Sequence, residues 1–207
     1  MKKTSKVLLL TFCAVLLVVG SILGTLAYLT SQDEVINTFT VGNVAITLDE
    51  KDVDNSTENA ERDKENAYKL IPGHTYVKDP TIHVDANSED CYLFVKVENE
   101  ISDIEPTADG ADADKRIDKQ MATNGWTAVE STVNVYVYTK STASPYKVRG
   151  NADIIVFEKF TIDNGVKNNT LANFSEKKIT VTAYAIQADG FDGKTAADIW
   201  TAAKNFS

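Results

Sequence analysis

Two histidines, His74 and His83, are the residues from which catalytic chemistry could first be suspected. Zinc proteases of the HExxH type hold their metal with two histidines one helical turn apart and a glutamate between them. In this chain the two histidines are more widely spaced. His74 follows Gly73 in a predicted turn, and His83 lies in a predicted strand, where we expect it to point outward. We therefore predict no zinc site and no metal-dependent proteolysis.

Other catalytic patterns are missing from the sequence as well. The chain has no GxSxG nucleophile elbow, no glycine-rich phosphate loop and no Cys–His pair with local support for nucleophilic chemistry. Its carboxylates are scattered through predicted loops rather than set on neighbouring strand faces. We predict that the protein is not an enzyme, with no catalytic residues and no cofactor. An enzyme of an unfamiliar kind is the alternative that the sequence leaves open.

The segment DVDNSTENAERD, residues 52–63, is the one stretch with some likeness to a calcium loop. Asp52 and Asp54 have the spacing of the first two ligands of an EF-hand. Thr57, however, stands where the loop needs glycine, and Asp63 stands where it needs a bidentate glutamate. We therefore expect a solvated acidic surface loop within the excursion 49–66 and assign no metal ligands. Calcium binding by the acidic loops stays open.

The N-terminus has the three parts of a secretory signal. An uncharged apolar run, Val7–Leu29, follows three lysines at positions 2, 3 and 6. A basic region, an apolar region and a small-residue site together are typical of a signal peptide. We expect Thr25 and Ala27 at the −3 and −1 positions of the cleavage site, so that the mature chain begins at Tyr28. The domains are then a signal peptide, 1–27, and a single domain, 28–207.

An uncleaved signal anchor is the alternative to cleavage. The apolar run Val7–Leu29 is long enough to cross a bilayer, whose core needs about 20 residues. In either case the lysines stay inside and the chain after Tyr28 is exported, so membrane contact is expected only through the uncleaved signal. We predict a secreted protein in the extracellular matrix or at the cell surface.

Charge and cysteine usage fit an exported domain that is stabilised by packing. The net charge is −9, and removal of the signal lysines makes it more negative. Nucleic acid and anionic lipid both need a basic face and are therefore not expected as partners. Cys13 leaves with the signal, so Cys91 is alone and cannot form an intramolecular disulfide.

The mature chain reads mainly as short strands. Apolar residues alternate before Gly42 and change parity after it, which predicts two strand segments with a kink at that glycine. The dipeptide Pro72-Gly73 predicts a type II turn. Alternation or continuous apolar character then predicts further strands, in Cys91–Glu98, Thr132–Thr139, Ile154–Phe160 and Lys177–Gln187.

Two short helical segments are expected at the periphery. Residues 102–124 are rich in Asp and Ala and predict an insertion between strands, in which Ile117 and Met121 are the apolar contacts of a short helix. Near the C-terminus, Thr195 and Asp198 are spaced as a capping box that begins a helix. Together with the strands, these features predict an all-β fold, an antiparallel β-sandwich with short peripheral helices.

Three stretches resemble the TasA/camelysin family. They are GTLAYLTSQDEVINTFTVGNVAITLDE near the signal, LIPGHTYVKDPTIHVDANSEDCYLFVKVENEI, and KKITVTAYAIQADGF. The resemblance covers Lys2–Leu48, Leu70–Ile101 and Lys177–Phe191, and nothing is recognised between Ser102 and Asn173. Members of this family are exported proteins of Gram-positive bacteria, cut by a dedicated SipW-type signal peptidase, and they include fibre subunits of the biofilm matrix. The resemblance implies a jelly-roll-like form of the sandwich.

The resemblance also implies a structural function. The expected protein is a secreted subunit of extracellular biofilm-matrix fibres, whose N-terminal segment, once freed by cleavage, completes the sheet of the next subunit. The expected partners are other copies of the chain, the signal peptidase and an accessory matrix protein. The donor segment is 28–41 joined through Gly42, with the self-assembly residues Tyr28, Leu29, Val35, Ile36, Phe39, Val41 and Gly42.

Three alternatives remain beside fibre assembly by strand donation. The N-terminal segment could be an edge strand of its own monomer. The protein could be a monomeric surface adhesin or binding module that uses the acidic loops with Tyr136 and Tyr138. Because camelysin relatives have been described as metalloproteases, a secreted metalloprotease is the third alternative, against which the spacing of the histidines argues.

Overall fold

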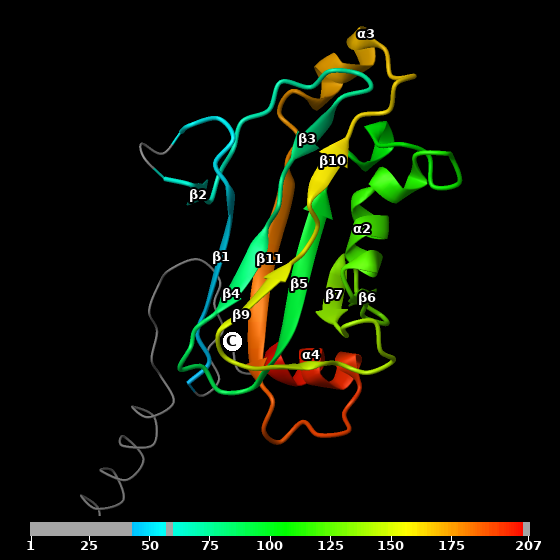
Figure 1. The fold of residues 1–207 in the computed structure, drawn as a ribbon. Helices are drawn as coiled ribbons and strands as arrows, with labels where there is room; N and C mark the ends of the chain where they lie inside the picture. The colour runs from blue at the N-terminus through cyan, green and yellow to red at the C-terminus, as the bar shows by residue number, and fades with distance from the viewer. Residues whose placement is uncertain (1–42, 57–59, 205–207) are drawn as a thin grey trace, which may run out of the picture. The chain divides into compact units, whose positions relative to one another are not determined.

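The alternating apolar residues of the chain build two layers of antiparallel strands with a core between them (Figure 1). The computed structural model describes residues 43–56 and 60–204, which fall in one compact unit. The predicted signal peptide and the donor segment lie outside the described residues, and so do all the residues assigned to cleavage and self-assembly: Thr25, Ala27, Tyr28, Leu29, Val35, Ile36, Phe39, Val41 and Gly42.

The larger sheet is organised around β5, Cys91–Asn99. Its strand order is β11-β5-β7-β6, and β8 also pairs with β5. The long partner β11, Ile179–Gln187, pairs with β5 over its whole length, with Val95 opposite Ala183. The remaining strands are shorter: β7 is Val135–Tyr138, β6 is Trp126–Ala128 and β8 is Lys147–Val148.

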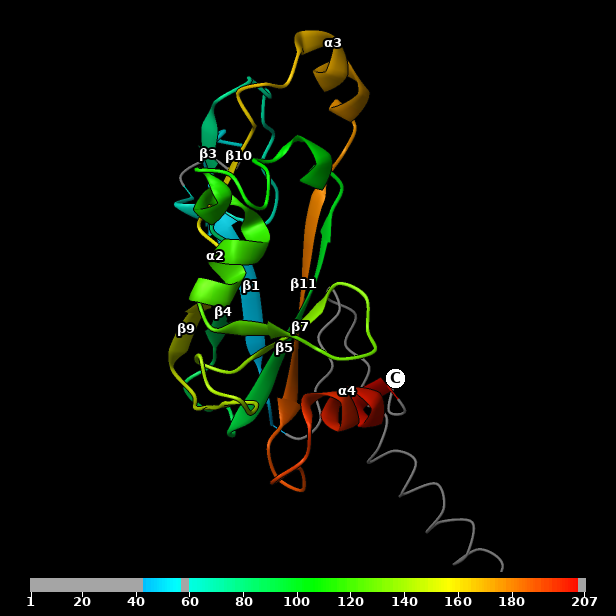
Figure 2. The ribbon, with the colours of Figure 1, turned by 90° about the vertical axis from the view of Figure 1, so that its right-hand side faces the viewer.

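The second layer contains the four-stranded sheet β2-β1-β4-β9. Its central pair is β1, Ile46–Lys51, and β4, Thr81–Val84, with Leu48 opposite Ile82. The strand β9, Ala152–Ile155, flanks β4, and the two-residue β2, Arg62–Asp63, meets only the end of β1. A separate pair, β3 (Thr75–Val77) with β10 (Lys159–Thr161), lies further along the same side of the molecule (Figure 2).

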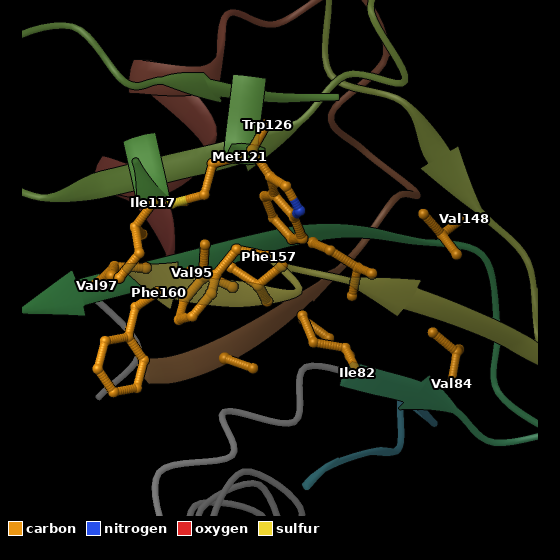
Figure 3. Close-up of a cluster of buried hydrophobic side chains, with 14 of the residues drawn as sticks. Ile82, Val84, Val95, Val97, Ile117, Met121, Trp126, Val148, Phe157 and Phe160 are labelled. Atoms are coloured by element: carbon orange, nitrogen blue, oxygen red, sulfur yellow. The ribbon is translucent and has the colours of Figure 1, made fainter. Parts of the chain in front are cut away.

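The core fills the space between the layers (Figure 3). Residues of β5 at odd positions, Cys91, Leu93, Val95 and Val97, are all buried there, as the alternation predicted. They meet Ile82 and Val84 of β4, together with Phe157 and Phe160. Burial of these side chains removes apolar surface from water, which is the main driving force for association of the two layers.

A second apolar cluster covers the outer face of β5 and β11. Tyr92 and Phe94, at even positions of β5, pack there with Ile186 and with Trp200 of the helix α4, Ala196–Lys204. The expected capping box begins this helix, because Oγ1 of Thr195 donates to Asp198 and accepts from the backbone N–H of Asp198. The larger sheet is therefore covered on both faces.

The stretch 102–124 packs one side against the core, and residues 107–112 within it are exposed. It contains two 3-10 turns, η1 (Ser102–Ile104) and η2 (Ala113–Lys115), followed by the helix α2, Ile117–Thr123. Ile117 and Met121 are buried, as expected for its apolar contacts. The described helical elements are completed by α3, Asn168–Leu171, and η3, Ala172–Phe174.

Two sequence-based expectations are wrong in detail. The predicted strand Ile154–Phe160 is divided into β9 and β10. Consecutive Val156 and Phe157 are both fully buried in the same core cluster, whereas consecutive residues of a regular strand point to opposite faces. The surface excursion was predicted to begin at residue 49, which is too early. In the structure β1 continues to Lys51, and Glu50 of this strand is buried.

The fold class itself is confirmed: the described chain is an all-β, antiparallel, sandwich-like structure with few short helices. Among the described residues, no helix has the length and apolar character needed to cross a membrane.

Candidate functional site

The free edges of the two layers form the candidate site of assembly. In the described part of the chain, β11 has β5 as its only paired neighbour, so its other edge is open. β1 is paired with β4, and on its other side β2 reaches only Glu50 and Lys51. β1 and β11 approach each other without pairing. We call β1 and β11 together the open seam.

Apolar side chains along the open seam are incompletely covered. Ile46 and Leu48 of β1 and Ile179 and Val181 of β11 pack against the core, yet each is only half-buried. Further along β11, Ala183 and Ala185 are buried on the same face. Because an open strand edge presents unpaired N–H and C=O groups, such a seam can accept another strand.

The two histidines have separate surroundings. The ring of His74 packs edge-on against Tyr76, with the ring centres 4.6 Å apart. The imidazole of His83, on the outward face of β4 as predicted, lies between Asp153 and Asp49. Among the described residues, one group of at least three potential metal ligands converges, and neither histidine belongs to it.

That converging group is Asp52, Asp54 and Asp63, the three positions singled out by the likeness to a calcium loop. Oxygens of these carboxylates lie within 4.8 Å of one another. The same carboxylates also organise the loop, since Asp52 accepts from the backbone N–H of Asn55 and Asp54 accepts from that of Ala67. The second hydrogen bond is the largest cause that lowers the pKa of Asp54. Turn formation therefore accounts for the cluster without an ion.

Cys91 is fully buried in the core. Burial is the main cause, with the nearby charge of Asp90, that raises the pKa of its thiol to about 12. The neutral thiol behaves as a small apolar side chain here.

The tyrosines considered for an adhesin are engaged with the fold. Tyr136 and Tyr138 of β7 are half-buried against the core. The ring of Tyr138 lies between Trp126 and Tyr146, with ring centres 5.3 and 6.0 Å away. These contacts leave only part of each ring for a ligand.

A buried polar group was missed by the sequence reasoning. Glu50 in β1 is 4% exposed, and its carboxylate meets both the Lys78 amine and the Asn66 amide. A signal for its burial was present, because Glu50 continues the inward alternation of Val44, Ile46 and Leu48. The partners Lys78 and Asn66 come from other segments, and only folding brings them together.

Comparison with known proteins adds no relative: no protein-family model, no curated protein and no solved structure matches this chain. The resemblance to the TasA/camelysin family stays a prediction from the sequence.

Proposed function

We propose that this protein is a secreted structural subunit of extracellular biofilm-matrix fibres of the TasA/camelysin kind. Signal peptide cleavage after Ala27 frees the segment 28–41, which then pairs with the open seam of a neighbouring subunit. The observation that carries the proposal is the edge of β11 that pairs with no described strand, beside half-buried Ile179 and Val181. An incoming extended strand would gain backbone hydrogen bonds and cover these apolar side chains.

Release of the donor segment explains how assembly is restricted to the outside of the cell. Residues 28–41 include β-branched and aromatic residues, which favour a strand, and the first two of them, Tyr28 and Leu29, are the end of the apolar run Val7–Leu29. While this run is held in the membrane, the segment beside it cannot reach a neighbour. Cleavage by a SipW-type signal peptidase is therefore the step that permits assembly, and an accessory matrix protein would act at the start of growth.

A truncation pair tests the donor segment. A mature chain that begins at Tyr28 is expected to form fibres in electron micrographs and to grow in size with concentration. A chain that begins at Asn43 keeps all described strands and is expected to remain a folded monomer. Fibres from the shorter chain would refute strand donation by this segment.

A substitution on β11 tests the acceptor. Val181→Lys places a charge on the core-facing side of the edge, a feature that opposes pairing with another strand. It should reduce fibre formation, whereas Thr180→Lys, on the exposed face of the same strand, should leave it unchanged. Circular dichroism must show that both variants fold. Equal assembly by the two folded variants would exclude β11 as the acceptor.

A monomeric adhesin is the second candidate, and the same material tests it. Concentration-independent size of the chain that begins at Tyr28 would favour it over fibre assembly. Casein turnover that chelators abolish would instead indicate the secreted metalloprotease.

A further inference from the structure

Three polar side chains from three segments of the chain meet near the C-terminal end of β1. Glu50 lies in β1, Asn66 follows β2, and Lys78 follows β3. Oε2 of Glu50 lies 2.5 Å from Nζ of Lys78, and its Oε1 lies 3.0 Å from Nδ2 of Asn66. One carboxylate therefore holds an amine and a carboxamide side by side.

The Lys78–Glu50 pair is shielded from water, and Asn66 beside it is partly buried. The side chains of Lys78 and Glu50 are only 12% and 5% exposed. Tyr68 is a neighbour whose pKa is raised, first by burial and then by the charge of Glu50. Burial of two charges costs free energy, so a step that transfers a proton between this amine and this carboxylate is easier here than in water.

The carboxamide of Asn66 is arranged as an electrophile. Its Oδ1 accepts a hydrogen bond of 2.7 Å from the backbone N–H of Val53. A donor at this position polarises the carbonyl and stabilises the negative charge that develops on the oxygen when a nucleophile attacks the carbon. Its Nδ2 faces Glu50 and also donates to the backbone oxygen of Lys51 at 2.9 Å. Nucleophile, proton carrier, electrophile and oxyanion donor are thus all present.

We propose that Lys78 and Asn66 become joined by an intramolecular isopeptide bond, with Glu50 as the proton carrier. Nζ of Lys78 passes a proton to Glu50 and attacks Cγ of Asn66, so that the Nζ–Cγ bond forms. Glu50 then gives this proton to Nδ2, the Cγ–Nδ2 bond breaks and ammonia leaves, while Glu50 takes up the second proton that Nζ loses and passes it to the ammonia, which departs as ammonium. A primary amide and an amine give a secondary amide and ammonia, so no oxidant, reductant or other co-reactant is consumed.

Preorganisation by folding is the reason for a reaction between groups that are inert in solution. Holding both reactants on one carboxylate replaces a bimolecular encounter with an intramolecular one. The product closes a covalent ring through residues 66–78, which contains the Pro72-Gly73 turn and β3. A cross-link of this kind restricts the unfolded chain, as a disulfide does. The cross-link would stabilise a domain that cannot form an internal disulfide, because Cys91 is its one cysteine after the predicted signal.

A tryptic digest of the purified folded protein tests the bond. Trypsin cuts after Lys69 but cannot cut after an acylated Lys78. The expected product is branched: residues 65–69 joined to residues 70–96, lighter than the two unlinked peptides together by one ammonia. Fragment ions must locate the link between Asn66 and Lys78. Recovery of unlinked peptides alone, after prolonged incubation of the folded protein at neutral pH, would overturn the proposal.

Variants separate the cross-link from cyclisation of Asn66 to a succinimide, which also releases ammonia. Lys78→Arg keeps a positive charge beside Glu50 but removes the nucleophile. This variant should therefore show no mass loss of one ammonia. Glu50→Gln is similar in shape but cannot carry the proton and should also remain unlinked. The control Lys177→Arg changes another lysine that pairs with a glutamate, Glu100, at the surface, and should form the bond normally. Ammonia loss that persists in Lys78→Arg would assign it to the succinimide and refute the isopeptide bond.

Discussion

Nδ1 of His83 lies 2.6 Å from Oδ1 of Asp153, across the neighbouring strands β4 and β9. The other ring nitrogen, Nε2, lies 3.1 Å from Oδ1 of Asp49 in β1. One imidazole therefore links three strands of the four-stranded sheet. Since carboxylates only accept, both contacts are hydrogen bonds only when the ring is protonated and both nitrogens donate.

This arrangement predicts that stability falls as the pH rises. Partial burial by itself lowers the pKa of His83, but the hydrogen bonds and charges of Asp153 and Asp49 outweigh burial and raise it. A raised pKa means that the folded state binds the proton more tightly than the unfolded state. The stabilisation is complete below the unfolded pKa, about 6.5, and is lost as the pH rises through the higher folded value. Thermal unfolding over this pH range measures the loss.

His83→Gln should remove this part of the pH dependence, because glutamine cannot take up the proton. His74→Gln is the matched control, since His74 is the other histidine and contacts Tyr76 rather than a carboxylate. A His83→Gln profile that still falls like that of the wild type would assign the pH dependence to other groups. Arg62, which also bonds to Asp49, stays charged throughout the range.

Cys91→Ala is expected to destabilise the protein modestly and to leave assembly intact. The thiol is fully buried in the core, and removal of a small buried group costs about 1 kcal/mol. Its raised pKa and burial also predict slow labelling by thiol reagents in the native state and fast labelling after unfolding. Rapid native labelling, or loss of fibres on reduction, would place Cys91 at a contact between subunits.

Thr195→Ala should lower the free energy of unfolding by about 1 kcal/mol, because it removes the cap of α4. Both hydrogen bonds of the Thr195 hydroxyl with Asp198 are lost, while the packing of Ile199 and Trp200 is untouched. Denaturant unfolding measures the change. Thr201→Ala makes the same chemical change at an exposed position inside the helix and should not be destabilising. An equal loss in both variants would argue against the cap.

Ala27→Asp is expected to block signal processing and to retain the protein in the membrane fraction. A charged residue at −1 does not fit the small-residue site of a signal peptidase, and the uncut apolar run then serves as an anchor. Fractionation followed by immunoblotting measures the outcome. Release of the variant at the normal size would place the cleavage site elsewhere.

The sequence by itself determined the features that depend on local pattern. The alternation of Cys91, Leu93, Val95 and Val97 assigned the buried face of β5, because successive side chains of a strand point to opposite faces. The spacing of Thr195 and Asp198, which is that of a capping box, located the start of α4. Each of these signals lies within a few neighbouring residues, so no knowledge of distant segments was needed.

Only the tertiary structure decided which distant segments meet. The apolar run Ile154–Phe160 was divided because burial of Phe157 in the shared core overrode the strand pattern. Glu50, Asn66 and Lys78 are separated in sequence, and their convergence depends on the pairing of β1 with β2 and β4. Such contacts follow from packing of the whole chain, since buried polar groups must find partners wherever the fold supplies them.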